Sequence, residues 1–589
     1  MLILHPTRYY GIRRLTVKKL LVYLQNYKKE TVLGPLFKLF EATLELIVPL
    51  VVASVIDEGI SEGRIGYVAA MCGVLAALGL VGLGFSVTAQ YFSAKAAVGF
   101  VTKMRHGLFS HLQTLSYSDV DRLGTSTMIT RMTTDSSRVQ SGLNLALRLL
   151  LRSPFVVFGA MIMAFIIDEK SGISFAITIP VLSIIVFGIM FLTTPLYKKV
   201  QNGVDKILTR TRENLAGVRV IRAFGKEESE ACRFRDENEA LTVSQKKAGH
   251  ISALLNPMTY VVINLGIIFL IYTGALRVNE GDLSQGEVIA LYNYMSQILV
   301  ELIKLANLIV SITKALASAS RISAVLDIVP TQSYGEVTEW RSSEYAVEFN
   351  DVSLRYHGAG DNSLENVSFK VRHGETVGII GGTGSGKSSL ANLIPRFYDP
   401  TEGEVLVGGT PSSKYAKGVL TSKIGVVPQN AVLFSGTIRD NMKWLAPDAT
   451  DEQILEAIDI AQATDVIAAK GGLDAEVAGR GRNFSGGQRQ RLTIARALVG
   501  KPEILILDDS ASALDFATDA RLREAIRTRL GDSTVFIISQ RAASVMHADK
   551  IIVLDDGRVA AIGKHDELIR DCDAYREIYE SQFKKEAAV

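Results

Sequence analysis

Residues 375–398 read ETVGIIGGTGSGKSSLANLIPRFY, and this stretch decides the fold of the second half of the chain. A β-rich apolar run precedes the glycines and a helix-like run follows them. The G-x-x-x-x-G-K-S pattern from Gly381 to Ser388 therefore has the context that a phosphate-binding loop requires. Glycines allow backbone N–H groups to surround phosphate oxygens, and the N-terminus of the following helix adds positive potential. We predict that Lys387 contacts the terminal phosphates of a nucleotide and that Ser388 binds Mg²⁺. The predicted contact residues are Gly381, Thr383, Gly384, Ser385, Gly386, Lys387, Ser388 and Ser389.

From residue 345 onward, short β-rich runs alternate with helical segments, which is typical of an α/β domain with a largely parallel sheet. One of these runs, ILILDD at residues 504–509, ends in two carboxylates. An Asp at the carboxyl end of a buried strand, beside a phosphate loop, is placed to bind Mg²⁺ directly or through water. We assign this role to Asp508. The strand alone does not indicate what Asp509 does.

The first half of the chain has a different texture. The 589 residues are 48% apolar and have a positive mean hydropathy, which argues against an ordinary soluble enzyme. A helix needs about 20 mostly apolar residues to cross a hydrocarbon core about 30 Å thick. Six runs meet this requirement, near residues 32–56, 66–92, 143–167, 172–195, 254–276 and 286–312. We predict an α-helical membrane domain of six transmembrane helices (1–320), a linker (321–344) and an α/β nucleotide-binding domain (345–589).

Charge distribution predicts the orientation of these helices. The loops DEGISEGRIG, DEKSG and RVNEGDLSQG contain few Lys or Arg, whereas the N-terminal segment and residues 95–142 and 196–250 contain many. The short loops therefore face outside, and both termini and the nucleotide-binding domain are cytoplasmic. The two basic stretches are apolar-periodic, so we expect helices that continue into the cytoplasm. The N-terminal segment shows no cleavable signal, and we expect it at the cytoplasmic membrane surface.

The remaining composition restricts partners and compartment. The net charge of +3 gives no reason to expect a nucleic acid. Cys72, Cys232 and Cys572 are far apart and follow neither metal-ligand nor disulfide spacing, which favours a reducing compartment.

The stretch NFSGGQRQRLTIARAL lies between the phosphate loop and ILILDD, and this combination resembles the nucleotide-binding domain of ABC transporters. With six spans in front of it, the chain resembles an exporter-type half-transporter over nearly its whole length. Residues 117–135 and 212–234 resemble the two intracellular loops of that family. The resemblance implies ATP and Mg²⁺ as ligands. It also implies a second chain, because two such domains enclose each ATP between one phosphate loop and the other domain's signature.

Further site residues follow from this resemblance. Tyr356 would stack on the adenine, and Gln429 would contact Mg²⁺ and sense the membrane domain; either residue alone would be an ordinary loop side chain. Phe484 precedes the signature at a position where Leu is commoner. The signature itself is intact and consists of Ser485, Gly486, Gly487 and Gln488.

Two catalytic positions depart from the family pattern. The glutamate that activates the attacking water is replaced by Asp509, whose carboxylate is one methylene shorter. A misplacement of about 1 Å can cost on the order of 10²-fold in rate. The switch histidine is replaced by Gln540, whose amide can donate to a phosphate but cannot carry a charge. The loop EVAGRGR at 476–482 departs as well, with Ala478 and Gly479 where Gly and Glu are usual.

Either change alone fits harmless drift in a working homodimer, but the pair resembles heterodimeric multidrug exporters with one degenerate ATP site. The pair also disfavours a homodimeric pump with slow turnover. On this interpretation Lys387, Asp508, Asp509 and Gln540 form the degenerate site, and the signature completes a competent site with a partner's Glu and His. The expected function is ATP-driven export of small hydrophobic or amphipathic compounds across the cell membrane. The alternatives are lipid or peptide export, and a regulatory ATP-binding subunit or gated pore.

The resemblance also suggests where ATP closure is coupled to the membrane. The candidate segments are Asp119–Thr125 and Glu213–Phe224; without the resemblance, both are amphipathic solvated helices.

Lys38, Glu41 and Glu45 recur at helical spacing in the first span, so they share one face. That face either attracts amphipathic cations or contains a Lys38–Glu41 ion pair, and the sequence leaves both open. In the sixth span, Tyr292, Tyr294 and Met295 could contact a substrate, although ordinary helix packing is the favoured interpretation.

Overall fold

The computed structural model describes residues 19–341 and 343–583 of the chain. The prediction for the N-terminal segment lies largely outside these residues. The chain forms two compact units. One combines the chain up to Gln113 with Ser126–Ile328, and the other combines Thr114–Thr125 with the chain from Val329 onward.

Six helical segments in the described part of the chain are long and apolar enough to cross a membrane, which confirms the predicted number of spans. Their bounds are Leu21–Ile60, Ile65–Leu112, Thr125–Ile167, Glu169–Ala216, Glu227–Glu280 and Gln285–Leu326. The individual helices of this half are α2 (Lys28–Ser54), α3 (Ile65–Leu112), α4 (Tyr117–Leu123), α5 (Thr125–Thr130), α6 (Ser136–Leu149), α7 (Arg152–Ile167), α8 (Glu169–Ala216), α9 (Val218–Ala223), α10 (Glu227–Ala253), α11 (Leu255–Glu280) and α12 (Gln285–Leu326). A 3₁₀ helix (Leu21–Tyr27) and π-helical turns at Val55–Ile60 and Arg131–Asp135 complete them.

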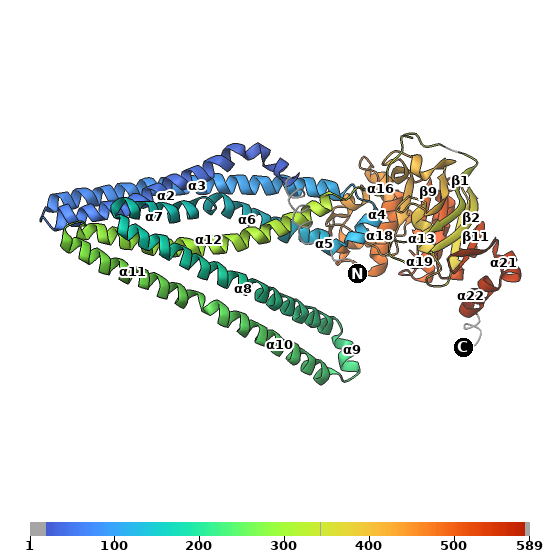
Figure 1. The fold of residues 1–589 in the computed structure, drawn as a ribbon. Helices are drawn as coiled ribbons and strands as arrows, with labels where there is room; N and C mark the ends of the chain where they lie inside the picture. The colour runs from blue at the N-terminus through green and yellow to red at the C-terminus, as the bar shows by residue number, and fades with distance from the viewer. Residues whose placement is uncertain (1–18, 342, 584–589) are drawn as a thin grey trace. The chain divides into compact units, whose positions relative to one another are not determined.

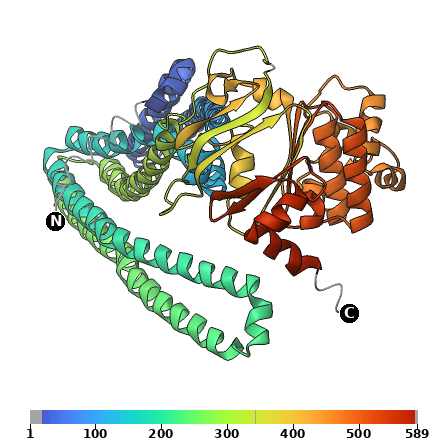
Figure 2. The same ribbon diagram turned by 90° about the vertical axis from the view of Figure 1, so that its right-hand side faces the viewer.

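Several of these helices are much longer than a membrane is thick. α3 and α8 contain 48 residues each, or about 70 Å at a rise of 1.5 Å per residue. Figures 1 and 2 show α8 and α10 side by side, with the short helix α9 at the end of this hairpin. The predicted extension of the helices beyond the membrane is therefore present.

Small and apolar side chains form the core between the membrane helices. Tyr294 and Met295 of α12 are fully buried in it, as expected for helix packing, and the Tyr294 hydroxyl donates to the Leu46 carbonyl of α2 at 2.5 Å. Tyr292 is exposed instead. A methyl group on Gly142 of α6 would collide with the Cβ of Ala315 in α12, so these two helices approach closely.

The second unit is built on a mostly parallel sheet, with an antiparallel sheet beside it. Within residues 343–583 the first has the strand order β12-β11-β3-β10-β9-β6, in which only β12 is antiparallel to its neighbour. Its strands are β3 (Thr376–Gly381), β6 (Ile424–Val427), β9 (Ile504–Asp508), β10 (Thr534–Ile538), β11 (Lys550–Asp555) and β12 (Arg558–Gly563). The antiparallel sheet has the order β2-β1-β4-β5, with bounds Leu364–Arg372, Tyr345–Leu354, Glu402–Val407 and Thr410–Pro411. A short pair joins β7 (Gly436–Thr437) to β8 (Glu476–Val477).

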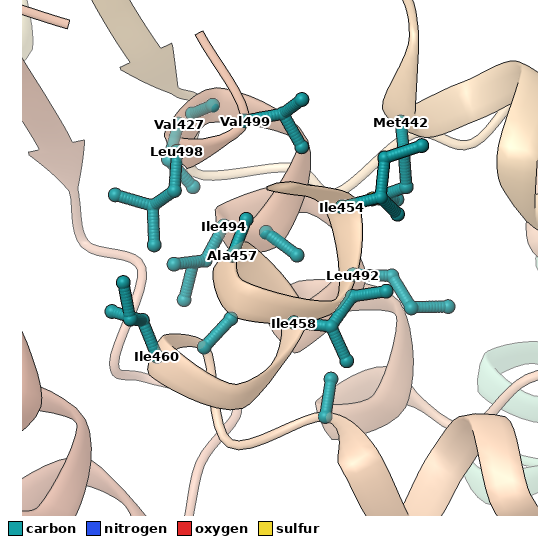
Figure 3. Close-up of a cluster of buried hydrophobic side chains, with 14 of the residues drawn as sticks. Val427, Met442, Ile454, Ala457, Ile458, Ile460, Leu492, Ile494, Leu498 and Val499 are labelled. Atoms are coloured by element: carbon teal, nitrogen blue, oxygen red, sulfur yellow. The ribbon is translucent and has the colours of Figure 1, made fainter. Parts of the chain in front are cut away.

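Helices cover this sheet and form its largest apolar core. Figure 3 shows α16 and α18 packed through Ile454, Ile458, Leu492 and Ile494, with Val427 of β6 beside them. The core fixes α18, the helix that begins with the signature. The helices of this unit are α13 (Lys387–Leu393), α14 (Val419–Lys423), α15 (Ile438–Met442), α16 (Asp451–Ile460), α17 (Thr464–Lys470), α18 (Gly486–Leu498), α19 (Phe516–Arg529), α20 (Ala542–Val545), α21 (His565–Asp571) and α22 (Asp573–Phe583), with 3₁₀ turns at Ser412–Lys414 and Gly479–Gly481.

Candidate functional site

Three neighbouring parallel strands bring the predicted catalytic residues to one edge of the sheet. β10 lies between β3 and β9, and Ile538 of β10 is aligned with Ile379 of β3 and with Asp508 of β9. The phosphate loop follows β3, Gln540 follows β10, and Asp509 follows β9. Residues more than 150 positions apart in sequence therefore meet where parallel strands share their carboxyl ends, the usual place for ligands in such sheets.

The loop between β3 and α13 has a backbone that requires glycine. Gly384 and Gly386 have φ angles of 87° and 90°, which L side chains rarely adopt. At Gly386 an added Cβ would also lie 2.5 Å from the Ser363 carbonyl oxygen. α13 begins directly at Lys387, so the loop leads into a helix N-terminus.

Lys387 is nearly buried and turned into its own loop. Its Nζ donates to the carbonyl oxygens of Gly381 at 3.0 Å and Gly382 at 2.5 Å. Burial lowers the pKa of Lys387, while the carboxylates of Asp509 and Asp508 oppose that shift. The ammonium group is thus close to the place where the loop would hold phosphates.

Two oxygen donors suited to Mg²⁺ stand beside the loop. The Ser388 hydroxyl donates to Asp508 Oδ1 at 3.0 Å. Burial raises the pKa of Asp508, although the Ser388 bond and the charge of Lys387 oppose the rise. A hard cation that prefers oxygen ligands would favour the ionised carboxylate, so this pair fits the predicted metal.

Asp509 occupies a strained backbone position. Its φ is 44°, in the left-handed region that Asp and Asn tolerate better than most residues. Its N–H donates to the Ile538 carbonyl at 2.9 Å, which ties it to the end of β10. Its Oδ2 accepts a long hydrogen bond of 3.4 Å from the Gln429 side-chain amide. The structure thus places Gln429 beside Asp509, and its contact with Mg²⁺ stays a prediction.

Gln540 is exposed, and its backbone is fixed by the C-terminal helix α22. Gln582 of α22 donates to the Gln540 carbonyl at 2.8 Å and accepts from the Ala542 N–H at 2.9 Å. This contact is not predictable from the sequence, because Gln582 belongs to no recognisable motif.

The signature begins α18 with a complete N-terminal cap. The Ser485 hydroxyl accepts from the Gln488 N–H at 3.3 Å, and the Gln488 side chain accepts from the Ser485 N–H at 3.0 Å. This capping box leaves open space around Gly486, so the helix N-terminus is accessible to an anion. Phe484 is buried in the core beneath it, and Lys470 lies 5.1 Å from its ring centroid.

Comparison with known proteins decides the family. The family model described as "ABC transporter transmembrane region" matches residues 31–302, and the model described as "ABC transporter" matches residues 364–512. An uncharacterized ABC transporter ATP-binding protein of Bacillus subtilis, YfiB, is 34% identical over 97% of this chain and 100% of its own length. The chain belongs to the ABC transporter family.

Other relatives agree with this ABC transporter assignment. An ATP-dependent lipid A-core flippase of Hahella chejuensis is 31% identical over 91% of both chains. A solved structure of a bacterial Atm1-family ABC exporter with ATP bound has the same fold, with a TM-score of 0.78, 24% identity, and coverage of 94% of this chain and 98% of that one. The chain therefore has the fold of an exporter-type half-transporter, and it is a multi-pass membrane protein with an ATP-hydrolysing domain.

The segment predicted as the first intracellular loop packs on the ATP-binding domain of this ABC transporter, in the same compact unit. Tyr117 of α4 stacks on Phe397 at 4.6 Å between centroids, and Tyr398 donates to Asp121 at 2.6 Å. Tyr398 also meets the predicted adenine-contacting Tyr356 edge to face at 5.0 Å. A chain of aromatic contacts thus joins Tyr356 to α4. Phe397 and Tyr398 belong to no recognisable motif, so the sequence alone does not predict these contacts.

Asp119 holds this loop in place. It is buried, accepts from the Thr331 N–H at 3.0 Å and forms a capping box with Ser116 at the start of α4. Burial alone would raise the pKa of Asp119, but the hydrogen bonds from Thr331 and Ser116 outweigh it and hold the pKa below its usual range. The ionised carboxylate is therefore the favoured form in the folded chain.

The helix α9, which lies within the predicted second intracellular loop, is exposed. No residue of this helix is buried within the described chain, and Val220 and Phe224 are 61% and 74% exposed. Exposed apolar side chains at the end of a long hairpin are typical of a contact surface.

The two open interpretations of the first span can now be compared. Lys38 pairs with Glu41 at 2.5 Å, as one of them proposed. Glu45 pairs at 2.5 Å with Arg152, which also binds the buried Glu301 at 2.7 Å. Both acidic residues of the shared face are therefore engaged by cations of the chain itself.

The loop at 476–482 is ordered by Asn483. Its side chain donates to the Glu476 carbonyl at 2.8 Å and accepts from the Ala478 N–H at 3.1 Å. Arg480 in this loop has a φ of 61°. The departure from the family pattern is thus accommodated by local hydrogen bonds.

Proposed function

We propose that this chain is one subunit of a heterodimeric ATP-driven exporter in the cell membrane, with its nucleotide-binding domain in the cytoplasm. Its own phosphate loop forms a degenerate ATP site that binds ATP persistently and hydrolyses it slowly. Its signature completes a competent site whose catalytic Glu and His belong to the partner.

The observation that carries this proposal is the adjacency of Asp509 and Gln540 at the ends of β9 and β10. Both altered positions border the same phosphate loop, so they weaken one site rather than two. The Asp509 carboxylate is shorter than glutamate and is drawn towards Gln429. Gln540 cannot replace the charge of a histidine.

ATP and Mg²⁺ are the ligands that the site residues fit. Lys387 and the loop N–H groups would bind the phosphates, and Ser388, Gln429 and Asp508 would hold the metal. Bound Mg²⁺ would neutralise charge on the phosphate oxygens. Tyr356 would stack on the adenine from the edge next to Tyr398.

The proposed cargo is a small hydrophobic or amphipathic compound that reaches the transporter from the membrane. Lipid export is the second candidate, and the similarity to a protein named as a lipid flippase supports it. The exposed Val220 of α9 and the exposed Phe224 that follows this helix support the requirement for a second chain, which would cover them.

The test is ATPase activity of the purified chain in lipid, alone and with the partner, with the partner's catalytic Glu intact or replaced by Gln. We expect little activity from this chain alone, full activity from the pair, and a loss of roughly 10²-fold when the partner's Glu is replaced.

An Asp509→Asn variant is the matched change on this chain. In the pair it should lower turnover by less than about twofold, because the site it belongs to contributes little. Brisk hydrolysis by this chain alone that Asp509→Asn abolishes would show a competent homodimer and overturn the proposal.

A further inference from the structure

The cytoplasmic parts of α3, α6 and α12 carry charge of one sign. Residues 95–112 of α3, all of α6 and residues 302–326 of α12 contain lysines and arginines but no Asp or Glu. The acidic residue of the turn before α6, Asp135, is buried and bound by Arg131 and Arg321. This region of the first unit therefore has a positive excess.

A groove lies between α6 and α12 in this region. It has a volume of about 530 Å³ and is lined by two cations, Arg138 and Lys314, and by hydroxyl groups that include Thr134, Ser137 and Ser141. Leu145 lies at its apolar part, one helical turn beyond Ser141. No carboxylate lines it among the residues that the structure describes.

The donors of the groove are available for a ligand. Within residues 19–341, neither Arg138 nor Lys314 forms an ion pair with another side chain. Arg105 of α3 adds a third cation, a guanidinium that donates to the Ser137 hydroxyl at 3.3 Å while its buried Nε has no partner. Guanidinium, ammonium and hydroxyl groups together suit phosphate or carboxylate oxygens.

We propose that this groove binds the anionic head of an amphipathic cargo, a phosphate or carboxylate held by Arg138 and Lys314, with the apolar tail directed past Leu145. The inference rests on the proposed export function and adds the charge of the cargo. It replaces cation recognition by Glu41 and Glu45, because Lys38 and Arg152 already bind those carboxylates.

The position of the groove relative to the membrane suits an amphiphilic ligand. Ser311, which also lines it, follows the first residue of α12 by 26 positions, or about 39 Å of helix. That exceeds a hydrocarbon core of about 30 Å and reaches the headgroup layer. Basic residues near the headgroup layer are common on the cytoplasmic side of membrane proteins. This site differs from scattered surface lysines because its cations line a groove together with several hydroxyl groups.

The experiment measures binding without nucleotide, so that its result does not depend on how the ATP sites work. The full-length chain in phosphatidylcholine nanodiscs is titrated with decyl phosphate and with decyltrimethylammonium, which share a tail and differ in charge. We expect decyl phosphate to bind at least about 10-fold more tightly. The double variant Arg138→Ala/Lys314→Ala should lose this preference, and Arg138→Lys should keep part of it.

Lys199→Ala is the control, because it removes an exposed cation from α8 and should leave both affinities unchanged. A thermal unfolding curve for each variant separates lost binding from lost folding. Equal affinity of the wild-type chain for the two probes, or decyl phosphate binding that survives the double variant, would overturn the proposal.

Two competition arms identify the source of the anionic group. Displacement of decyl phosphate by phosphatidylglycerol in the nanodisc supports a lipid headgroup as the occupant. Displacement by inorganic phosphate, with no effect of phosphatidylglycerol, supports a soluble amphiphile read by its head. If neither competes, decyl phosphate is held by its tail and the proposed charge recognition is wrong.

Discussion

The phosphate-loop edge of the sheet and the N-terminus of α18 belong to one domain, yet they differ in how many of the residues usual in ABC transporters they keep. The loop edge keeps Lys387, Ser388 and Asp508 but has Asp509 and Gln540 at positions where ABC transporters usually have Glu and His. The signature keeps all its residues and a complete capping box. In the proposed heterodimer each ATP site combines a loop from one chain with a signature from the other, so changes on the two faces act on different sites.

This difference means that substitutions on the intact face should cost more than substitutions on the altered face. In a homodimer substitutions on the two faces should cost about the same, since every substitution would act on both sites. Four changes test the comparison, and they are ordered by expected size.

Ser485→Arg should have the largest effect. The new side chain would fill the open helix N-terminus and replace the cap, so ATP could not be held against the signature. We expect ATPase activity of the pair to fall roughly 10²-fold, although this chain's own phosphate loop is unchanged. Thr528→Arg on the exposed face of α19 is the control and should have no effect. Normal turnover in the Ser485 variant would show that the signature face does not support hydrolysis.

Asp509→Glu combined with Gln540→His restores the usual family residues. We expect hydrolysis at this site to rise by roughly 10-fold, because the carboxylate reaches further and the histidine can carry a charge. The assay uses a partner whose catalytic Glu is replaced by Gln, so that only this site contributes. Unchanged activity would mean that the site is slow for a reason other than these two residues.

Lys387→Ala separates nucleotide retention from turnover. Retention of labelled ATP after rapid gel filtration should be lost, since the loop no longer offers an ammonium group to the phosphates. Steady-state turnover of the pair should fall by only about threefold, the partner site being intact. A fall as large as that of Ser485→Arg would make the two faces equivalent and contradict the comparison.

Tyr398→Phe should have the smallest effect. It removes the hydrogen bond to Asp121 and keeps the ring contacts with Tyr117 and Tyr356. Loss of one such bond corresponds to about twofold weaker coupling, measured as cargo-stimulated ATPase. Burial, followed by the bond to Asp121, raises the pKa of Tyr398, so its hydroxyl stays protonated and the ratio of variant to wild type should be constant across the neutral pH range.

Much of this architecture was predictable because it is local in sequence. The loop after β3 and the strand ending at Asp508 were recognised from short motifs, and parallel pairing then required their carboxyl ends to meet. The six spans followed from apolar length alone. The boundaries moved outward, since α2 continues through a π-helical turn to Ile60.

The parts that were missed depend on contacts between distant segments. Arg152 and Glu301 are 149 residues apart, and neither stands out until α7 and α12 are side by side. Phe397 and Tyr398 belong to a stretch that reads as the end of a helix, and its pairing with α4 is a tertiary feature. The groove at Arg138 and Lys314 likewise requires two helices that are far apart in sequence.

The hydrogen bonds of Gln582 connect the last helix, α22, to Gln540, although α22 itself contributes no residue to the proposed ATP site. Its side-chain amide is hydrogen-bonded to the Gln540 carbonyl and the Ala542 N–H, on either side of Arg541. The orientation of Gln540 therefore depends on α22 staying packed in this position. A protease that cuts before α22, or a regulatory protein that displaces this helix, would change the position of Gln540 without contacting the nucleotide. Helix α22 is therefore a place where the binding of another protein would regulate ATP hydrolysis from outside the proposed dimer interface.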